Sequence, residues 1–434
     1  MDTLSRLCSG ELAGSSRLDL CCGLTEFPRE IFDLADTLEI LNLSGNRLSE
    51  LPDDFARLHK LRILFCSDNS FDHLPSVLGG CPNLEMVGFK ANQIATVEEA
   101  SLSPSLRWLI LTDNRIGSLP ASIGRCLRLQ KLMLAGNRLS HLPDEMAACV
   151  NLELIRLAAN DFSGFPDWLF ELPRLSWLGL GGNPWSDRQC RDEPTMVSVE
   201  WESLRISHVL GEGASGVIHH AHWHTEAGSQ AVAVKVFRGE VTSDGLPASE
   251  VAACMVGGNH RNLIGVMGKV SNHPDGKSGL VMSLIDSDFA NLAGPPSFDS
   301  CTRDVYAEGE TFDLAAVLQM VCSLASVACQ LHERGILHGD FYAHNVLCNE
   351  EGDCLLGDFG AASFYRENEW LERIEVRAFG CLLEELLERC ATAQNEAGVL
   401  ANLWALQGAC MAEMVLERPL FAEILLKLEN PNFR

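Results

Sequence analysis

Three polar residues in the C-terminal half of the sequence have the types and the spacing of a phosphoryl-transfer centre. Asp340 and Asn345 stand five positions apart, and Asp358 follows thirteen residues later, directly before Phe359 and Gly360. An Asp in the first position can accept the proton of an attacking hydroxyl, and an Asn with a second Asp can hold Mg²⁺ against nucleotide phosphates. The pattern therefore predicts Asp340 as a catalytic base and Asn345 and Asp358 as metal ligands.

A glycine-rich loop lies upstream of this centre. Gly211, Gly213 and Gly216 follow a predicted strand, and a second β-rich run begins at Val217. Glycines let the backbone approach phosphates closely, which side chains would prevent. A dinucleotide-binding fold needs a helix directly after such a loop, whereas the residues after Val217 have the pattern of a strand. The loop therefore favours a phosphate site between two strands.

A lysine in the middle of the next β-rich run is a further candidate. Lys235 lies within Val232–Phe237, where a buried charge is costly unless it is used. We expect its ammonium to contact the α- and β-phosphates of a nucleotide and to pair with a glutamate on the following helix. Glu250 is the best candidate for that glutamate.

Residues 204–434 resemble the protein kinase superfamily. Besides the motifs above, the resemblance rests on His338 before the catalytic Asp, on Phe379-Gly380 and on Arg418-Pro419. It implies a bilobal α+β fold that uses ATP and Mg²⁺, with Lys235 and Glu250 among the catalytic residues. It also implies that Val217 and Ala233 pack on the adenine.

Several departures from the kinase pattern limit what this resemblance implies. Gly339 stands where most kinases have an arginine, so we do not expect control by activation-loop phosphorylation. Tyr342 replaces the phosphate-contacting lysine of serine/threonine kinases, and we expect His344, when protonated, to supply part of that charge. Only fourteen residues separate Gly360 from Glu375, and no Ala-Pro-Glu is present. The segment that normally docks a peptide substrate is nearly absent.

Three functions remain open at this stage. The intact set of Lys235, Asp340, Asn345 and Asp358 favours an ATP-dependent protein kinase, nominally serine/threonine-specific. The shortened activation segment fits a pseudokinase scaffold that binds proteins without efficient transfer. His-Gly-Asp without Ala-Pro-Glu also resembles the aminoglycoside and choline kinase-like branch, which phosphorylates small molecules.

The N-terminal half has a different organisation, dominated by an internal period. Asparagines recur at spacings of 22 or 23 residues, at Asn46, Asn69, Asn92, Asn114, Asn137, Asn160 and Asn183. Each follows a Leu-x-Leu-like strand, which resembles the leucine-rich repeat family and implies an α/β solenoid, the leucine-rich repeat horseshoe. Leucines of the strand point into the core, and the Asn side chain caps the turn that leaves it. We assign residues 1–186 to the repeats, 187–203 to a linker and 204–434 to the kinase-like domain.

Large apolar residues gather on the strand positions that point away from this core. These positions hold Trp108, Ile110, Met133, Leu154 and Trp177. A contiguous apolar patch usually marks an interaction site, so we expect a protein partner or substrate on this concave face. The alternative is that the kinase half covers the face within the same chain.

Composition and charge limit which binding partners and which cellular compartment we expect for the protein. The formal net charge of −26 argues against nucleic acid or an anionic membrane as a partner. The 17 cysteines show no paired metal-binding spacing. We therefore expect them to act as small buried hydrophobic residues in a protein of a reducing compartment. No basic region followed by a long apolar run begins the sequence. We therefore expect a soluble, cytoplasmic protein without a membrane span.

Overall fold

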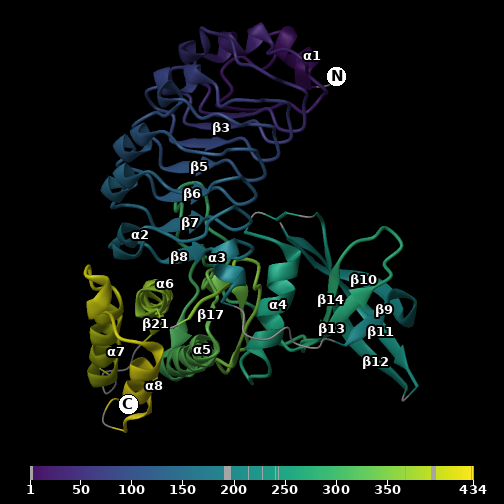
Figure 1. The fold of residues 1–434 in the computed structure, drawn as a ribbon, viewed down its shortest axis with the longest axis vertical. Coiled ribbons are helices and arrows are strands. Elements are labelled where there is room, and N and C mark those ends of the chain that lie inside the picture. Colours follow the sequence, from purple (N-terminus) through teal and green to yellow (C-terminus); the bar gives the residue numbers. More distant parts are fainter. Residues whose placement is uncertain are drawn as a thin grey trace. The chain divides into compact units, whose positions relative to one another are not determined.

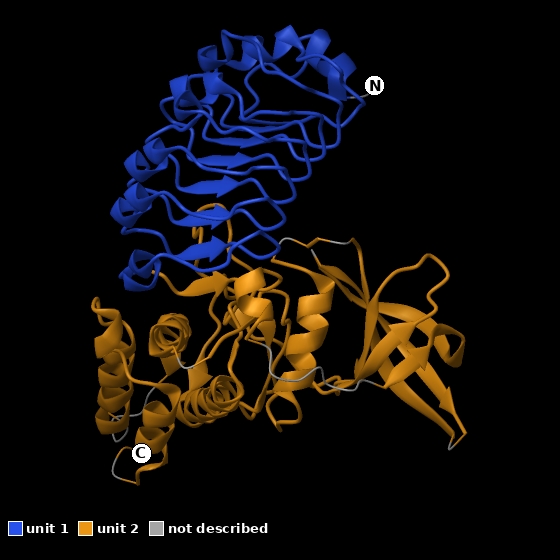
Figure 2. Ribbon diagram, viewed as in Figure 1, with its two compact units in different colours: residues 1–174 blue, residues 175–434 orange. Residues whose placement is uncertain are grey.

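The computed structural model describes residues 3–189, 197–213, 215–226, 228–239, 241–242, 244–366, 368–391, 397–431 and 433. Contacts divide the chain into two compact units, residues 1–174 and residues 175–434 (Figure 2). From the sequence, we assign residues 1–186 to the repeats. By its contacts, the last part of that range, from Leu175 onward, belongs to unit 2. Residues 190–196 of the expected linker lie outside the described residues.

Unit 1 is a solenoid of short parallel strands with short helices along one side (Figure 1). Its strands pair in sequence order from β1 to β7. They are β1 (Arg17–Asp19), β2 (Ile40–Asn42), β3 (Ile63–Phe65), β4 (Met86–Gly88), β5 (Trp108–Ile110), β6 (Lys131–Met133) and β7 (Leu154–Arg156). The α-helices are α1 (Thr3–Cys8) and α2 (Asp167–Glu171), and 3₁₀ helices such as Ala121–Arg125 occupy most other turns.

The asparagine ladder has the predicted role in unit 1. The Asn114 amide donates to the carbonyls of Phe89 and Leu111 at 2.9 and 3.0 Å, and its oxygen accepts from the backbone N–H of Ile94 at 2.9 Å. One side chain thus satisfies backbone groups of two neighbouring repeats. The residue in the middle of each strand, a leucine in most of them, is buried, as at Leu41 and Leu109. The period therefore sets both the core and the stacking, as predicted.

The N-terminal lobe of unit 2 is built on a six-stranded sheet in the order β10-β11-β12-β14-β13-β9. The strands are β9 (Ser198–Glu200), β10 (Leu204–Glu212), β11 (Gly216–Thr225), β12 (Gly228–Phe237), β13 (Val266–Ser271) and β14 (Gly279–Ser283). Helix α4 (Pro247–Gly257) packs beside it. One face of the sheet forms a core that includes Val199, Val234 and Val281.

The C-terminal lobe of unit 2 is mainly helical, and Figure 1 shows its helices at the end of the unit away from the β9–β14 sheet. The helices are α5 (Leu314–Glu333), α6 (Glu369–Glu388), α7 (Ala397–Cys410) and α8 (Phe421–Glu429). A three-stranded sheet and two strand pairs complete it. The sheet has the order β15 (Ala290–Asn291), β18 (Val346–Cys348) and β19 (Cys354–Leu356), and the pairs are β16 (Phe312–Asp313) with β21 (Cys390–Ala391) and β17 (Ile336–Leu337) with β20 (Ser363–Phe364). Unit 2 begins with β8 (Trp177–Gly179) and α3 (Pro184–Asp187).

Helix α5 is the one helix of the described residues with the length and hydropathy to cross a membrane. In its most apolar window 61% of the residues are buried inside the molecule. It packs against α6, α8 and β19. The apolar sequence of α5 is therefore accounted for by its place at the centre of the C-terminal lobe.

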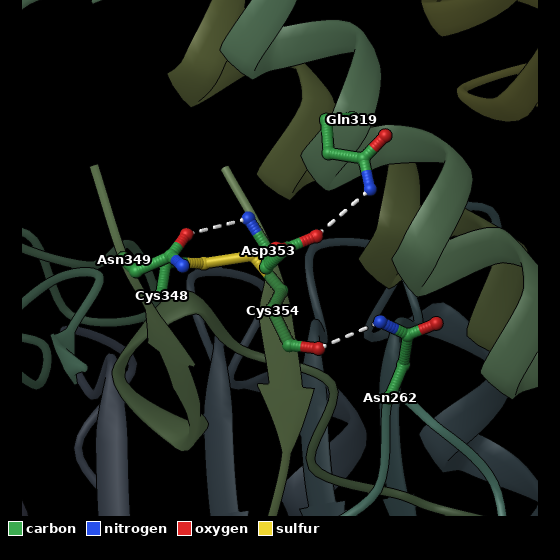
Figure 3. Close-up of a disulfide and its surroundings, with 6 residues drawn as sticks. All are labelled: Asn262, Gln319, Cys348, Asn349, Asp353 and Cys354. Atoms are coloured by element: carbon green, nitrogen blue, oxygen red, sulfur yellow. Dashed lines mark hydrogen bonds between the residues drawn. A yellow bond between two sulfur atoms is a disulfide. The ribbon is translucent and has the colours of Figure 1, made fainter. Parts of the chain in front are cut away.

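One cysteine expectation is wrong. Cys348 and Cys354 form a disulfide, with their Cα atoms 4.3 Å apart (Figure 3). They are directly opposite each other in the antiparallel pair of β18 and β19, which brings two cysteines within bonding distance. Cys126 and Cys149 are among the cysteines that are buried thiols as expected, and burial raises the pKa of both to about 11.

Candidate functional site: a lysine, two carboxylates and a catalytic loop

Strand β12 and helix α4 bring Lys235 and Glu250 together. The Lys235 ammonium lies 2.5 Å from the Glu250 carboxylate, and both side chains are buried. Glu250 stands in the first turn of α4, where the helix dipole favours a negative charge. The charge that is costly inside a sheet therefore has the partner that the sequence predicted.

The loop after β19 supplies a second carboxylate to the same lysine. Asp358 lies 3.3 Å from the Lys235 ammonium, and its own carboxylate accepts from the backbone N–H of Gly360. Asp358 has a φ of +51°, which turns the chain sharply behind the strand. The Nε2 atom of His338 lies at hydrogen-bond distance, 2.9 Å, from the carbonyl oxygen of Gly357 and holds this turn in place. Lys235 thus faces two acidic groups at once.

The pKa values of the two carboxylates beside Lys235 are shifted in opposite directions. Burial alone would raise the pKa of Asp358, but Lys235 and the Gly360 N–H hold it below its usual value. Burial raises the pKa of Glu250 to about 7, against the opposing effect of Lys235. Burial opposes the charge of Lys235 as well, yet the attraction of Asp358 and Glu250 raises its pKa. Asp358 is therefore the ionised carboxylate, suited to a divalent cation.

The catalytic loop, residues 338–345, places the expected base beside the expected metal ligand. The Asn345 amide donates to the Asp340 carboxylate at 2.8 Å and to its carbonyl at 2.9 Å. The carbonyl of Asn345 in turn accepts from the backbone N–H of Gly357, next to Asp358. The structure thus joins all three residues of the phosphoryl-transfer pattern through direct contacts or adjacent backbone.

A buried glutamate of α6 holds the start of this loop. Glu375 accepts from the backbone N–H groups of His338 and Gly339 at 3.2 and 2.6 Å, and its other partner is the His332 ring at 2.8 Å. Burial alone would raise the pKa of Glu375, but these bonds hold it below its usual value. In the sequence, Glu375 is singled out by its distance from Gly360, but this role is not predicted.

Gly339 has a structural reason to replace arginine. Its φ is +74°, and a Cβ there would lie 2.6 Å from the carbonyl oxygen of Leu178 and 2.7 Å from that of Ala361. No side chain fits between these two backbones. The departure from the kinase pattern is therefore tied to the last repeat, which occupies this space.

His344 has a partner that sequence reasoning missed. Its Nδ1 lies 2.7 Å from the Asp304 carboxylate, which also accepts from the backbone N–H of His344 at 3.1 Å. Burial alone would lower the pKa of His344, but Asp304, with Asp340 and Asp358 further away, raises it. The environment of the ring therefore favours its protonated form near the two site carboxylates. No motif marks Asp304, forty residues upstream.

The glycine-rich loop divides into open and packed positions. Around Gly211 and Gly213 nothing lies within 4 Å of where a Cβ would be, so the backbone there is accessible to a phosphate. A Cβ at Gly216 would lie 2.5 Å from the carbonyl of Val236, so this glycine serves close strand packing. Ala233 is two residues from Lys235 and lies on the same face of β12.

The prediction for Val217 is wrong. Val217 pairs with Val236, while the neighbouring Ile218 pairs with Lys235. Opposite residues of antiparallel strands point to the same face, so Val217 belongs to the face away from the nucleotide site. It lines a cavity there with Trp201 and Val236. Ile218 is the residue on the face of Lys235.

Two of the residues that we expected to bind a partner on the concave face are buried. Leu154 is 3% exposed and Trp177 is 2% exposed, so neither offers a surface to a second protein. For Trp177 the cause is within unit 2, because its indole stacks on Tyr342 at 4.2 Å. At Trp177 the alternative of contact within the chain is the correct one.

The donor set fits ATP with Mg²⁺. Among the described residues, no three His, Cys, Asp or Glu side chains are grouped as a metal site. Asp358 and Asn345 supply two oxygen donors, and Mg²⁺ commonly takes only one or two protein ligands and completes its shell with phosphates and water. A metal that binds together with a nucleotide is what this site can hold.

Comparison with known proteins finds two kinds of similarity. A protein tyrosine and serine/threonine kinase family matches residues 204–377, and leucine-rich repeat families match residues 37–58, 104–162 and 127–184. The serine/threonine-protein kinase mos of Gallus gallus is 25% identical over 199 residues, or 43% of this chain and 56% of that protein.

Two further relatives match one half each. A probable serine/threonine-protein kinase of Arabidopsis thaliana is 26% identical over 37% of this chain and 20% of its own length. Leucine-rich repeat and calponin homology domain-containing protein 1 of Mus musculus is 32% identical over 28% of this chain and 18% of its own length. The chain thus spans between about a fifth and just over half of the lengths of these relatives.

Proposed function

Because the chain combines leucine-rich repeats with a protein tyrosine and serine/threonine kinase domain, we propose that it transfers the γ-phosphate of ATP to a serine or threonine of a protein partner. One observation carries the proposal. The Lys235 ammonium lies between Glu250 and Asp358, and Asn345 is bonded to Asp340, as phosphoryl transfer requires.

Each residue of the site has a distinct task. Asp340 accepts the proton of the acceptor hydroxyl while the hydroxyl oxygen forms a bond to the γ-phosphorus. The bond from that phosphorus to the bridging oxygen breaks, and the electron pair leaves with ADP. Lys235 holds the α- and β-phosphates, and Glu250 keeps its ammonium in place. Asn345 and Asp358 would hold Mg²⁺, which neutralises phosphate charge.

The repeats of unit 1 supply the surface for the partner. Trp108, Ile110 and Met133 are half-buried on neighbouring strands, and the Lys131 ammonium lies 4.3 Å from the centre of the Trp108 ring. Aromatic residues within a patch dominate interface energies, at about 2 kcal/mol or more each. Trp108→Ala should therefore lower phosphorylation of a recruited protein while Mg·ATP still binds.

The cytoplasm is the proposed place of action. Cys66, Cys126 and Cys149 are free thiols buried in the repeats. This usage is typical of proteins kept in a reducing compartment. The Cys348–Cys354 pair would then be a dithiol in the cell and a disulfide after oxidation.

The nature of the acceptor is tested with radiolabelled ATP. Wild-type protein and Asp340→Ala are each incubated with [γ-³²P]ATP, Mg²⁺ and dephosphorylated casein, and the labelled residues are identified after hydrolysis. Phosphoserine or phosphothreonine from the wild type alone is the expected result. ATP binding without any transfer would favour the pseudokinase scaffold. Transfer to choline or an aminoglycoside, but not to casein, would favour a small-molecule phosphotransferase.

A further inference from the structure

The last repeat, residues 175–187, is in direct contact with the catalytic loop. The Trp177 indole stacks on the Tyr342 ring with centroids 4.2 Å apart and planes 4° apart, and its Nε1 donates to the carbonyl of Phe341 at 3.2 Å. Both rings are buried. The Tyr342 ring in turn lies 4.9 Å from the His344 ring, which Asp304 holds. A column of rings therefore runs from the repeat to the middle of the catalytic loop.

The last repeat also binds the short segment 361–366 that follows Gly360. The backbone N–H of Leu180 donates to the Ser363 hydroxyl at 2.7 Å. The Ser186 hydroxyl donates to the carbonyl of Phe364 at 3.2 Å and accepts from its N–H at 3.1 Å. On its other side the segment pairs as β20 with β17. It is thus held from both sides without any phosphate.

Close backbone approach makes this contact specific to the present sequence. A Cβ at Gly181 would lie 2.6 Å from the carbonyl oxygen of Ala362, and one at Gly339 would lie 2.6 Å from that of Leu178. Larger residues at either position would force the two backbones apart. Each side of the contact therefore carries a glycine that the other side requires.

We infer that the last repeat does the work of the missing part of the activation segment, with Trp177 as a positioning residue for Asp340. The inference rests on the proposed kinase function. Asp340 lies between Gly339, which Glu375 holds, and Phe341, whose carbonyl Trp177 binds. The catalytic loop is thereby fixed as the chain folds, and no arginine or loop phosphate is needed.

The test compares four full-length proteins: wild type, Trp177→Ala, Trp177→Phe and the control Trp168→Ala. Trp168 belongs to unit 1, where it is half-buried on α2 and its Nε1 donates to the Asp144 carboxylate at 3.3 Å. Steady-state ADP release from Mg·ATP gives kcat, and titration calorimetry with a non-hydrolysable ATP analogue gives Kd. Amide hydrogen exchange follows residues 339–346.

The expected result is a selective loss of kcat. Trp177→Ala should lower kcat by about 10- to 100-fold, the usual effect of a displacement of about 1 Å at a reacting group. Its Kd should stay within about twofold, because Trp177 contacts Phe341 and Tyr342, whereas Lys235 is held by Glu250 and Asp358. Trp177→Phe keeps an aromatic ring for the stack on Tyr342 but loses the bond to the Phe341 carbonyl, so its kcat should lie between those of Trp177→Ala and wild type. Exchange of residues 339–346 should quicken in Trp177→Ala alone.

Three results would overturn the inference: unchanged kcat in Trp177→Ala, an equal loss in Trp168→Ala, or a Kd that rises as much as kcat falls. Failure of the proposed function is distinguishable. If wild-type protein shows no more ADP release than Asp340→Ala, the kinase proposal fails, and hydrogen exchange decides the positioning role. Unchanged exchange of residues 339–346 in Trp177→Ala would then refute it.

Discussion

Glu250→Gln should change how the stability of unit 2 depends on pH. The Lys235 ammonium lies 2.5 Å from the buried Glu250 and 3.3 Å from the more exposed Asp358, and a cation shared with Asp358 cannot fully compensate the burial of Glu250. Burial accordingly raises the pKa of Glu250 from 4.5 to about 7. The native protein therefore retains a proton on Glu250 at pH values where the unfolded chain has already released it.

The sign and the size of the effect follow from this difference. Between pH 4.5 and about 7 the native state binds more protons at this site than the unfolded state, so raising the pH destabilises the wild type. A difference of about 2.5 pH units corresponds to about 3 kcal/mol. Glutamine has no proton to lose, so Glu250→Gln should gain up to that amount relative to wild type across this range.

Urea unfolding at several pH values between 4.5 and 8 measures the change. The transition of unit 2 is identified as the one that Mg·ATP shifts to higher urea concentration. Glu350→Gln is the matched control, because Glu350 is an exposed residue of the same unit. If the difference between wild type and Glu250→Gln stays constant with pH, or if Glu350→Gln shows the same trend, Glu250 does not have the raised pKa.

Three other predictions concern the ladder, the disulfide and the nucleotide. Asn114→Leu should lower the free energy of unfolding by about 1–3 kcal/mol for each buried backbone group left unpaired, whereas exposed Asn83→Leu should not, because it releases only the His59 carbonyl, which water can reach; equal melting temperatures would refute the ladder role. Dithiothreitol should destabilise wild-type protein by about 2 kcal/mol through the Cys348–Cys354 loop but leave Cys354→Ser unchanged; equal responses would contradict this. Lys235→Met should weaken ATP binding, and Asp358→Asn should remove its dependence on Mg²⁺; equal thermal shifts in both variants and wild type would refute the site.

The parts of the site that the sequence predicted are those set by short, regular spacing. Asp340 and Asn345 are on one loop, so five residues suffice to place the amide against the carboxylate. The 23-residue period likewise determines which side chain meets which backbone turn in unit 1. Lys235 and Glu250 required one further inference, that a buried ammonium needs a nearby carboxylate.

The parts that were missed depend on how strands pair and on what covers a face. Val217 and Ile218 are equally apolar, and only the pairing with Val236 and Lys235 shows which one faces the nucleotide. Cys348 and Cys354 become opposite only when β18 and β19 form a hairpin. An exposed apolar face and one that meets another part of the chain have the same sequence pattern, as Trp177 demonstrates.

The central claim is that Asp340 acts as base in an ATP- and Mg²⁺-dependent transfer. The most direct measurement is single-turnover consumption of bound [γ-³²P]ATP by wild type and Asp340→Asn, with Mg²⁺ and with excess EDTA. Loss of the base should slow transfer by about 100- to 10,000-fold without weakening nucleotide binding, and EDTA should stop it. Equal rates for the two proteins, or transfer that persists in EDTA, would contradict the claim.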